Sequence, residues 1–87
     1  MSAYLVTYVL KNPNYDYSTF YGLMRSYPHI ALSNSTAVVN SGVPIKDFFE
    51  GIQPWIDSRD QVFVFELSKA WTGIGADETK KWLKDQV

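Results

Sequence analysis

Apolar runs with strand character mark both ends of the main part of the chain. Residues 3–10 (AYLVTYVL) are apolar or β-branched in both alternate sets of positions, which predicts a strand covered on both faces. Residues 61–67 (QVFVFEL) predict a second strong strand for the same reason. Between them, residues 29–40 (HIALSNSTAVVN) predict two short strands that meet at a tight turn over 33–35. We therefore expect four strands.

A helix is expected between the first and second strands, over about 16–26. It follows a turn at 11–14 (KNPN), and Asp16 suits its N-cap. It stops before Pro28, because proline disfavours the helical conformation in the residue that precedes it. Its apolar side chains recur at i, i+3, i+4 and i+7, on one helical face: Tyr17, Phe20, Tyr21 and Met24.

The strongest amphipathic signal predicts a second helix that opens at Pro44. Proline suits a first helical turn, whereas Pro54 is expected to kink or end the helix. A loop through Trp71 then leads to a short terminal helix over 76–85. The apolar positions of the second helix repeat at offsets 0, 3, 4, 7 and 11: Ile45, Phe48, Phe49, Ile52 and Ile56.

The order of these elements is β-α-β-β-α-β followed by a helix. Right-handed crossovers turn this order into an α+β, ferredoxin-like fold with a four-stranded antiparallel sheet. We expect one such domain over residues 1–87, with two helices on one face of the sheet. We expect the terminal helix to cover part of the other face, and a second subunit to cover the rest.

The last strand predicts an interaction surface. Val62 and Val64 alternate with Phe63 and Phe65, so both faces of this strand are apolar. An uncovered apolar sheet face indicates a binding surface. The candidate interaction residues are Val9, Lys11, Tyr15, Arg25, Val62 and Val64.

The composition of the chain excludes some classes of protein and disfavours others. The chain has 87 residues, a formal net charge of −1 and no cysteine, which excludes a disulfide scaffold and any cysteine-based metal site. Nucleic-acid binding is disfavoured because a basic excess is missing. The lysines at 80, 81 and 84 are interpreted as complementing the dipole of the terminal helix. No run of 18 apolar residues and no secretory leader are found, so a cytoplasmic location is expected.

The residues that could carry chemistry are few. His29 is the only histidine, so a zinc site and a histidine-based catalytic device both lack partners. The segment Gly73-Ile74-Gly75 lacks the lysine of a phosphate-binding loop, and no cofactor is expected. Asp57 and Asp60 remain as weak candidates for a metal or acid site, in a turn that is interpreted as solvated.

The aromatic stretch over 8–22 (YVLKNPNYDYSTFYG) allows two interpretations. Tyr15 and Tyr17 lie near basic residues in the sequence, as in a platform that stacks bases. Rings at helical spacing are more often part of a core, and Tyr17 has that spacing. Only Tyr15 therefore remains a candidate for outside contact.

Three segments together resemble the small CRISPR-adaptation nuclease-like family, especially its compact SinR-like members. They are YLVTYVLKNPNYDYSTFYGLMRSYP (4–28), DSRDQVFVFEL (57–67) and TGIGADETKKWLK (72–84). The resemblance implies a ferredoxin-like homodimer that, in CRISPR members, binds an integrase and DNA. It also implies that metal-dependent cleavage uses an aspartate closing the first strand. Val9 stands at that position here and cannot ligate a metal.

The sequence therefore favours a non-catalytic, homodimeric interaction module of bacterial or phage origin. One specific form is a protein that binds the surface of a host defence complex of the CRISPR type. A metal-dependent nuclease or toxin that uses Asp57 and Asp60 is the first alternative. A DNA- or RNA-binding scaffold without cleavage is the second.

Overall fold

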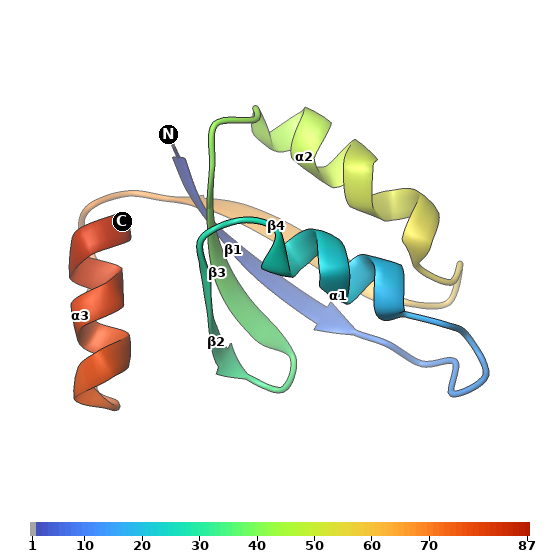
Figure 1. Cartoon of the computed structure of the whole chain (residues 1–87), viewed down its shortest axis with the longest axis horizontal. Coiled ribbons are helices and arrows are strands. Elements are labelled where there is room, and N and C mark those ends of the chain that lie inside the picture. Colours follow the sequence, from blue (N-terminus) through green and yellow to red (C-terminus); the bar gives the residue numbers. More distant parts are fainter. Residues whose placement is uncertain (1) are drawn as a thin grey trace.

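Four strands and three α-helices follow one another in a computed structural model that describes residues 2–87 (Figure 1). All seven were expected, and the bounds of β4 agree at both ends. Within residues 2–87, no helix has the length and apolar character needed to span a bilayer. The elements are β1 (Ser2–Val9), α1 (Ser18–Arg25), β2 (His29–Ser33), β3 (Thr36–Ser41), α2 (Ile45–Ile52), the 3-10 helix η1 (Gln53–Trp55), β4 (Gln61–Leu67) and α3 (Asp77–Gln86).

The strands form one sheet in the order β2-β3-β1-β4, and every neighbouring pair is antiparallel. The expected α+β class with a four-stranded antiparallel sheet is thus confirmed. β1 and β3 are central, in agreement with their apolar sequences, whereas β2 and β4 are edge strands. The pairing of β2 with β3 shifts register between Ala31 and Ser33, next to the turn expected at 33–35.

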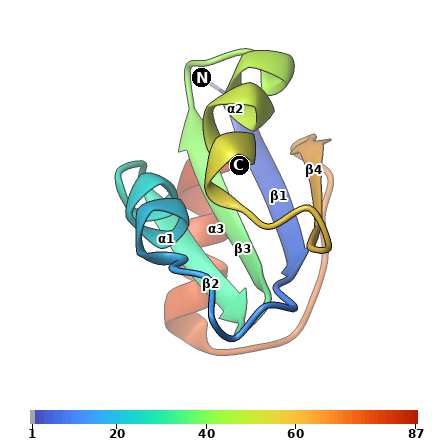
Figure 2. The same ribbon diagram turned by 90° about the vertical axis from the view of Figure 1, so that its right-hand side faces the viewer.

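One face of the sheet is covered by α1 and α2 (Figure 2). β1 contributes its even-numbered side chains, and the two helices bury an aromatic and an aliphatic residue each. Phe48 and Ile52 of α2 are each 2% exposed, as the helical periodicity predicts. The buried cluster consists of Tyr4, Val6, Tyr8, Phe20, Met24, Ala37, Val39, Phe48 and Ile52.

The start of α1 differs from the expectation. The helix begins at Ser18, and Asp16 accepts a hydrogen bond from its N–H at 2.9 Å. Tyr17 therefore precedes the helix and does not share its buried face; its hydroxyl is hydrogen-bonded elsewhere. Phe20 and Met24 are buried as expected, whereas Tyr21 is partly exposed and packs edge-on against Tyr8.

α2 begins directly after Pro44, whose conformation is extended. The helix ends at Ile52, and the chain tightens into η1, which contains Pro54. This agrees with the expected effect of a proline, which removes one helical hydrogen bond. The chain then turns at 57–60 and enters β4.

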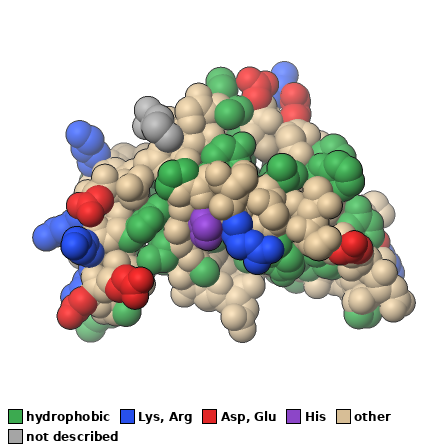
Figure 3. Space-filling model, viewed as in Figure 1, with side chains coloured by type: hydrophobic (Ala, Val, Ile, Leu, Met, Phe, Trp, Pro, Cys, Tyr) green, Lys and Arg blue, Asp and Glu red, His purple; other side chains and the backbone are tan. Residues whose placement is uncertain are grey.

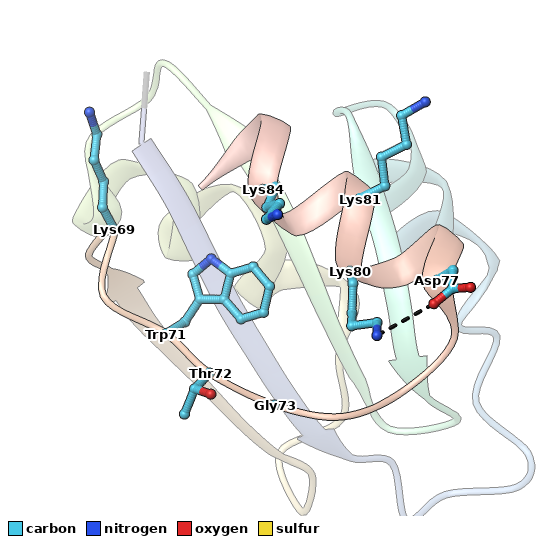
Figure 4. A pocket seen from close by; sticks show the side chains of 8 residues that line it. All are labelled: Lys69, Trp71, Thr72, Gly73, Asp77, Lys80, Lys81 and Lys84. Carbon is cyan, nitrogen blue, oxygen red and sulfur yellow. Dashed lines mark ion pairs between the residues drawn. The ribbon is translucent and has the colours of Figure 1, made fainter.

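The second face of the sheet is covered only in part, as expected. α3 lies against the β2–β3 half, where the Asn40 amide donates to the Gln86 carbonyl at 2.8 Å. The loop 68–76 carries the chain from the end of β4 to α3 and passes in front of β1 in Figure 4. Among residues 2–87, no helix lies over the β4 side of this face (Figure 2).

Candidate functional site

The valines proposed as interaction residues lie under the helices. In the sheet register Val62 is opposite Tyr8 and Val64 is opposite Val6, so both point to the helix-covered face. Both are half-buried against the core cluster. Their location leaves the alternate positions of β4 for the open face.

Phe63 and Phe65 occupy that open face. They are opposite Thr7 and Leu5 in the register, and their side chains are 52% and 53% exposed. Val9 lies on the same face, opposite Gln61, and is 47% exposed. We call Val9, Phe63 and Phe65 the β4 patch. Two large rings beside one another on an edge strand differ from singly scattered apolar residues, which need no explanation.

The backbone edge of β4 adds a second feature to this patch. Among residues 2–87, β4 pairs with β1 alone, so its outer row of N–H and C=O groups has no strand beside it. Such an edge is a template for pairing with another chain. The patch and the open edge belong to the same strand.

The other three proposed interaction residues are not gathered at the β4 patch. Lys11 is exposed, and its backbone N–H donates to Asp60 at 2.7 Å. Tyr15 is half-buried, and its ring lies 4.9 Å from that of Tyr17. Arg25 is exposed at the end of α1. Tyr15 therefore packs against Tyr17 in the loop before α1, with part of its side chain in contact with solvent.

Asp57 is held in a hydrogen-bonded turn. Its Oδ2 accepts from the Asn12 side-chain amide at 2.7 Å, and its Oδ1 accepts from the Arg59 N–H at 2.9 Å. The Arg59 guanidinium also lies 3.3 Å from Oδ1. The backbone hydrogen bond from Arg59, and then the amide of Asn12, lower the pKa of Asp57 to about 2.

Asp60 uses both carboxylate oxygens. Oδ1 accepts from the Lys11 N–H at 2.7 Å and from the Tyr17 hydroxyl at 2.9 Å, while Oδ2 accepts from the Asp57 N–H at 2.8 Å. Partial burial raises the pKa of Asp60, but the three hydrogen bonds outweigh it and the pKa is lowered. Burial raises the pKa of Tyr17, and the hydrogen bond that its hydroxyl donates to Asp60 raises this pKa further.

These two carboxylates tie the loop before α1 to the turn before β4. The turn, interpreted from the sequence as solvated, is so only in part: Ser58 and Arg59 are exposed, whereas the Asp57 side chain is 14% exposed and bonds to a residue 45 positions away. Within the described residues, no group of three or more His, Cys, Asp or Glu could hold a metal ion. The arrangement is that of a structural clamp, with its oxygens already engaged.

His29 and Glu66 take no part in a site. His29 is exposed on the edge strand β2, and its Nδ1 donates to the Tyr27 carbonyl at 2.8 Å. Glu66 is exposed on β4, and within residues 2–87 no ion pair joins it to Lys69. Within residues 2–87, neither side chain is hydrogen-bonded to a nucleophile that it could activate.

A basic cleft lies between α3 and the loop 68–76 (Figure 4). Its volume is about 660 Å³. Figure 3 shows charged side chains of both signs gathered over α3 at one end of the molecule. The cleft is lined by Lys69, Trp71, Thr72, Gly73, Asp77, Lys80, Lys81 and Lys84.

Both features, the β4 patch and the basic cleft, have signals in the sequence. In β4 the larger rings at 63 and 65 carry the exposed apolar area, whereas the smaller valines fit beneath helices. The lysines at 80 and 84 are four residues apart and share a flank of α3, and Trp71 lies in a loop that contains glycines. Asp77 and Glu78 lie in the first turn of α3 and Lys84 in its last turn, where the helix dipole favours them, whereas Lys80 and Lys81 lie outside the last turn, contrary to the expectation for these two.

Comparison of the chain with protein-family models, with curated proteins and with solved structures finds no match.

Proposed function

We propose that this chain is a non-catalytic interaction module that forms a homodimer through the β4 patch and binds a protein partner. The observation that carries the proposal is the exposure of Phe63 and Phe65 on the β4 half of the partly covered face. Burial of apolar surface contributes about 25 cal/mol per Å², so exposed rings favour a contact that removes them from water.

A dimer through β4 would bury the exposed rings of the β4 patch and pair the open backbone edge of the strand. A stable interface takes about 800 Å² from each partner, more than two phenylalanines and a valine supply. Pairing of the open β4 edge extends the contact, because backbone hydrogen bonds add affinity while the side chains set specificity. Two copies related by a two-fold axis present the same patch to each other, as closed dimers require.

We further propose that the fold is ferredoxin-like. The order β2-β3-β1-β4 supports this, because it places β3 between β1 and β2, and β1 between β3 and β4. Two interleaved βαβ units have this arrangement. The same fold is implied by the resemblance to the small CRISPR-adaptation nuclease-like family.

The proposed setting is the cytoplasm of a bacterial cell, with a bacterial or phage gene as the source. The absence of cysteine agrees with a reducing compartment. The resemblance suggests a host defence complex of the CRISPR type as the partner. Val9, which replaces the aspartate that the resemblance implies, is an exposed apolar residue of the β4 patch and so supports binding in place of cleavage.

Light scattering of the purified chain at micromolar concentration tests the homodimer. We expect a dimer mass for the natural chain and a monomer mass for Phe65→Ser. Trp55→Ser is the matched control, because Trp55 is 45% exposed and lies on η1, outside the β4 patch. A strict monomer in the natural chain contradicts the homodimer, and dissociation of both variants contradicts its assignment to this patch.

A further inference from the structure

The basic cleft contains an accessible tryptophan among lysines. Trp71 is 37% exposed, and in Figure 4 its indole lies between the loop and the flank of α3 that carries Lys80 and Lys84. Lys69 stands at the β4 end of the same cleft. Lys80 is 3.4 Å from Asp77, whose own side chain is fully exposed.

Basic side chains predominate on one flank of α3, and most of the nearby acids lie on the other. Four of the eight Lys and Arg residues of the chain line the cleft, together with one acid, Asp77. Glu78 and Asp85 line a different hollow on the other flank, with His29 and Trp82, and Lys81 borders both hollows. A chain with a net charge of −1 therefore has a locally positive cleft.

The cleft continues past the tryptophan. A second hollow of about 450 Å³ shares Trp71 and Lys80 with it. The remaining lining of this hollow is mainly apolar and includes Leu32, Ile74 and Leu83. The two hollows share lining residues and form a groove with a basic part, an apolar part and an aromatic ring at their junction.

This combination fits a ligand that alternates planar rings with negative charges. Single-stranded nucleic acid meets both requirements, because bases stack on aromatic side chains while a positive groove follows the phosphates. An acidic peptide would use the lysines but would leave the indole face without a planar partner. A duplex would hide its base faces from Trp71.

We propose that the groove between the loop 68–76 and α3 binds single-stranded nucleic acid. One base stacks on Trp71, and neighbouring phosphates contact Lys69, Lys80 and Lys84. Lys81 contributes little, because its side chain points away from Trp71 in Figure 4. The inference does not depend on the homodimer, since the groove is formed within one chain.

Fluorescence anisotropy with labelled twelve-nucleotide dT and rU strands tests the groove on the full chain. We expect Trp71→Ala to weaken binding about tenfold or more, which is the effect of losing one stacked base. Trp71→Phe is expected to keep most of the affinity because it keeps a ring. Trp55→Ala, which removes an exposed tryptophan outside the groove, is expected to leave the affinity unchanged.

Salt dependence tests the lysines. With three phosphate contacts, the logarithm of the binding constant should fall with log salt with a slope of about −2, and Lys80→Ala or Lys84→Ala should each reduce that slope by about 0.7. Lys46→Ala is the control, because Lys46 is exposed on α2.

Three outcomes would overturn the proposal. The first is no binding of either strand, and the second is equal weakening by Trp71→Ala and Trp55→Ala in variants that melt like the natural chain. The third is competition by a mononucleotide or an acidic peptide as strong as that by an unlabelled strand. Strong competition by a mononucleotide would indicate a site for a free nucleotide. Strong competition by an acidic peptide would indicate attraction by charge alone.

Discussion

The two faces of the sheet are built from the same strands, yet only one of them forms a closed core. On the helix-covered face Tyr4, Val6 and Val39 are at most 1% exposed. On the other face Phe63 and Phe65, from an equally apolar strand, are about half exposed at 52% and 53%. The position of the helices, and not the apolar content of the strand, therefore decides which side chains are buried in the core.

The partly covered face is itself divided. Its β2–β3 half lies under α3, where the Asn40 amide bonds to the end of the helix. Its β4 half has an open edge and the β4 patch. A residue on the helix-covered face should thus matter for stability, and one in the β4 patch should matter for association.

The largest expected effect comes from the helix-covered face. Phe48→Ala should lower the free energy of unfolding by about 3–5 kcal/mol, because a ring that is 2% exposed leaves a cavity. Phe65→Ala should cost about 1 kcal/mol or less, because half of its surface is already in water. Urea denaturation of both variants makes the comparison. Equal losses would show that both faces contribute to folding alike.

A smaller effect is expected from the clamp between the two loops. Asp60→Ala removes the acceptor for three hydrogen bonds and should lower the Tm by about 4–8 °C, a loss of about 1 kcal/mol in a domain of this size. Glu50→Ala, at an exposed position on α2, is the control for loss of an acid.

The second carboxylate of the clamp, Asp57, separates a structural role from a catalytic one. The natural chain is incubated with single- and double-stranded DNA and RNA, in magnesium or manganese and in EDTA as the control. We expect no metal-dependent cleavage of any of these substrates. Metal-dependent cleavage that disappears in Asp57→Ala, in a variant that still folds, would restore the nuclease alternative.

The smallest expected effect concerns acid. The pKa of Asp57 is lowered from 3.8 to about 2 in the folded chain, so the unfolded chain binds a proton more readily. Its contribution to stability is complete above about pH 4 and is lost as the pH falls toward 2. Denaturation midpoints over this range should fall less steeply in Asp57→Ala. Identical slopes in the two chains would contradict the clamp at Asp57.

Local pattern was sufficient for most of the fold. The spacing of Phe48 and Ile52 predicts the buried face of α2, and Pro54 predicts its end, because both depend on neighbours within a few residues. The limits of β4 follow in the same way. The start of α1 was placed two residues early, because Asp16 bonds to the N–H of Ser18 and Tyr17 is drawn to Asp60.

The candidate sites depend on residues far apart in the sequence, and here the pattern fails. Both alternate sets of side chains in β4 are apolar, so the sequence period does not distinguish Val62 and Val64 from Phe63 and Phe65. The packing of the helices on one face of the sheet determines which pair is covered. Asp57 looks solvated until Asn12 is brought beside it by the fold. The lysines of α3 become candidates for ligand binding only because the fold places Trp71 beside them in one cleft.

Amide hydrogen exchange of the natural chain, measured below and above the dissociation concentration of the dimer, tests most directly whether the fold leaves β4 open for a second copy. Amides of β3 should be protected at both concentrations, because β3 is paired on both sides. We predict that outward-facing amides of β4 exchange rapidly in dilute solution and become protected at high concentration. Protection of β4 that does not change with concentration would contradict the role assigned to its edge and to Phe63 and Phe65.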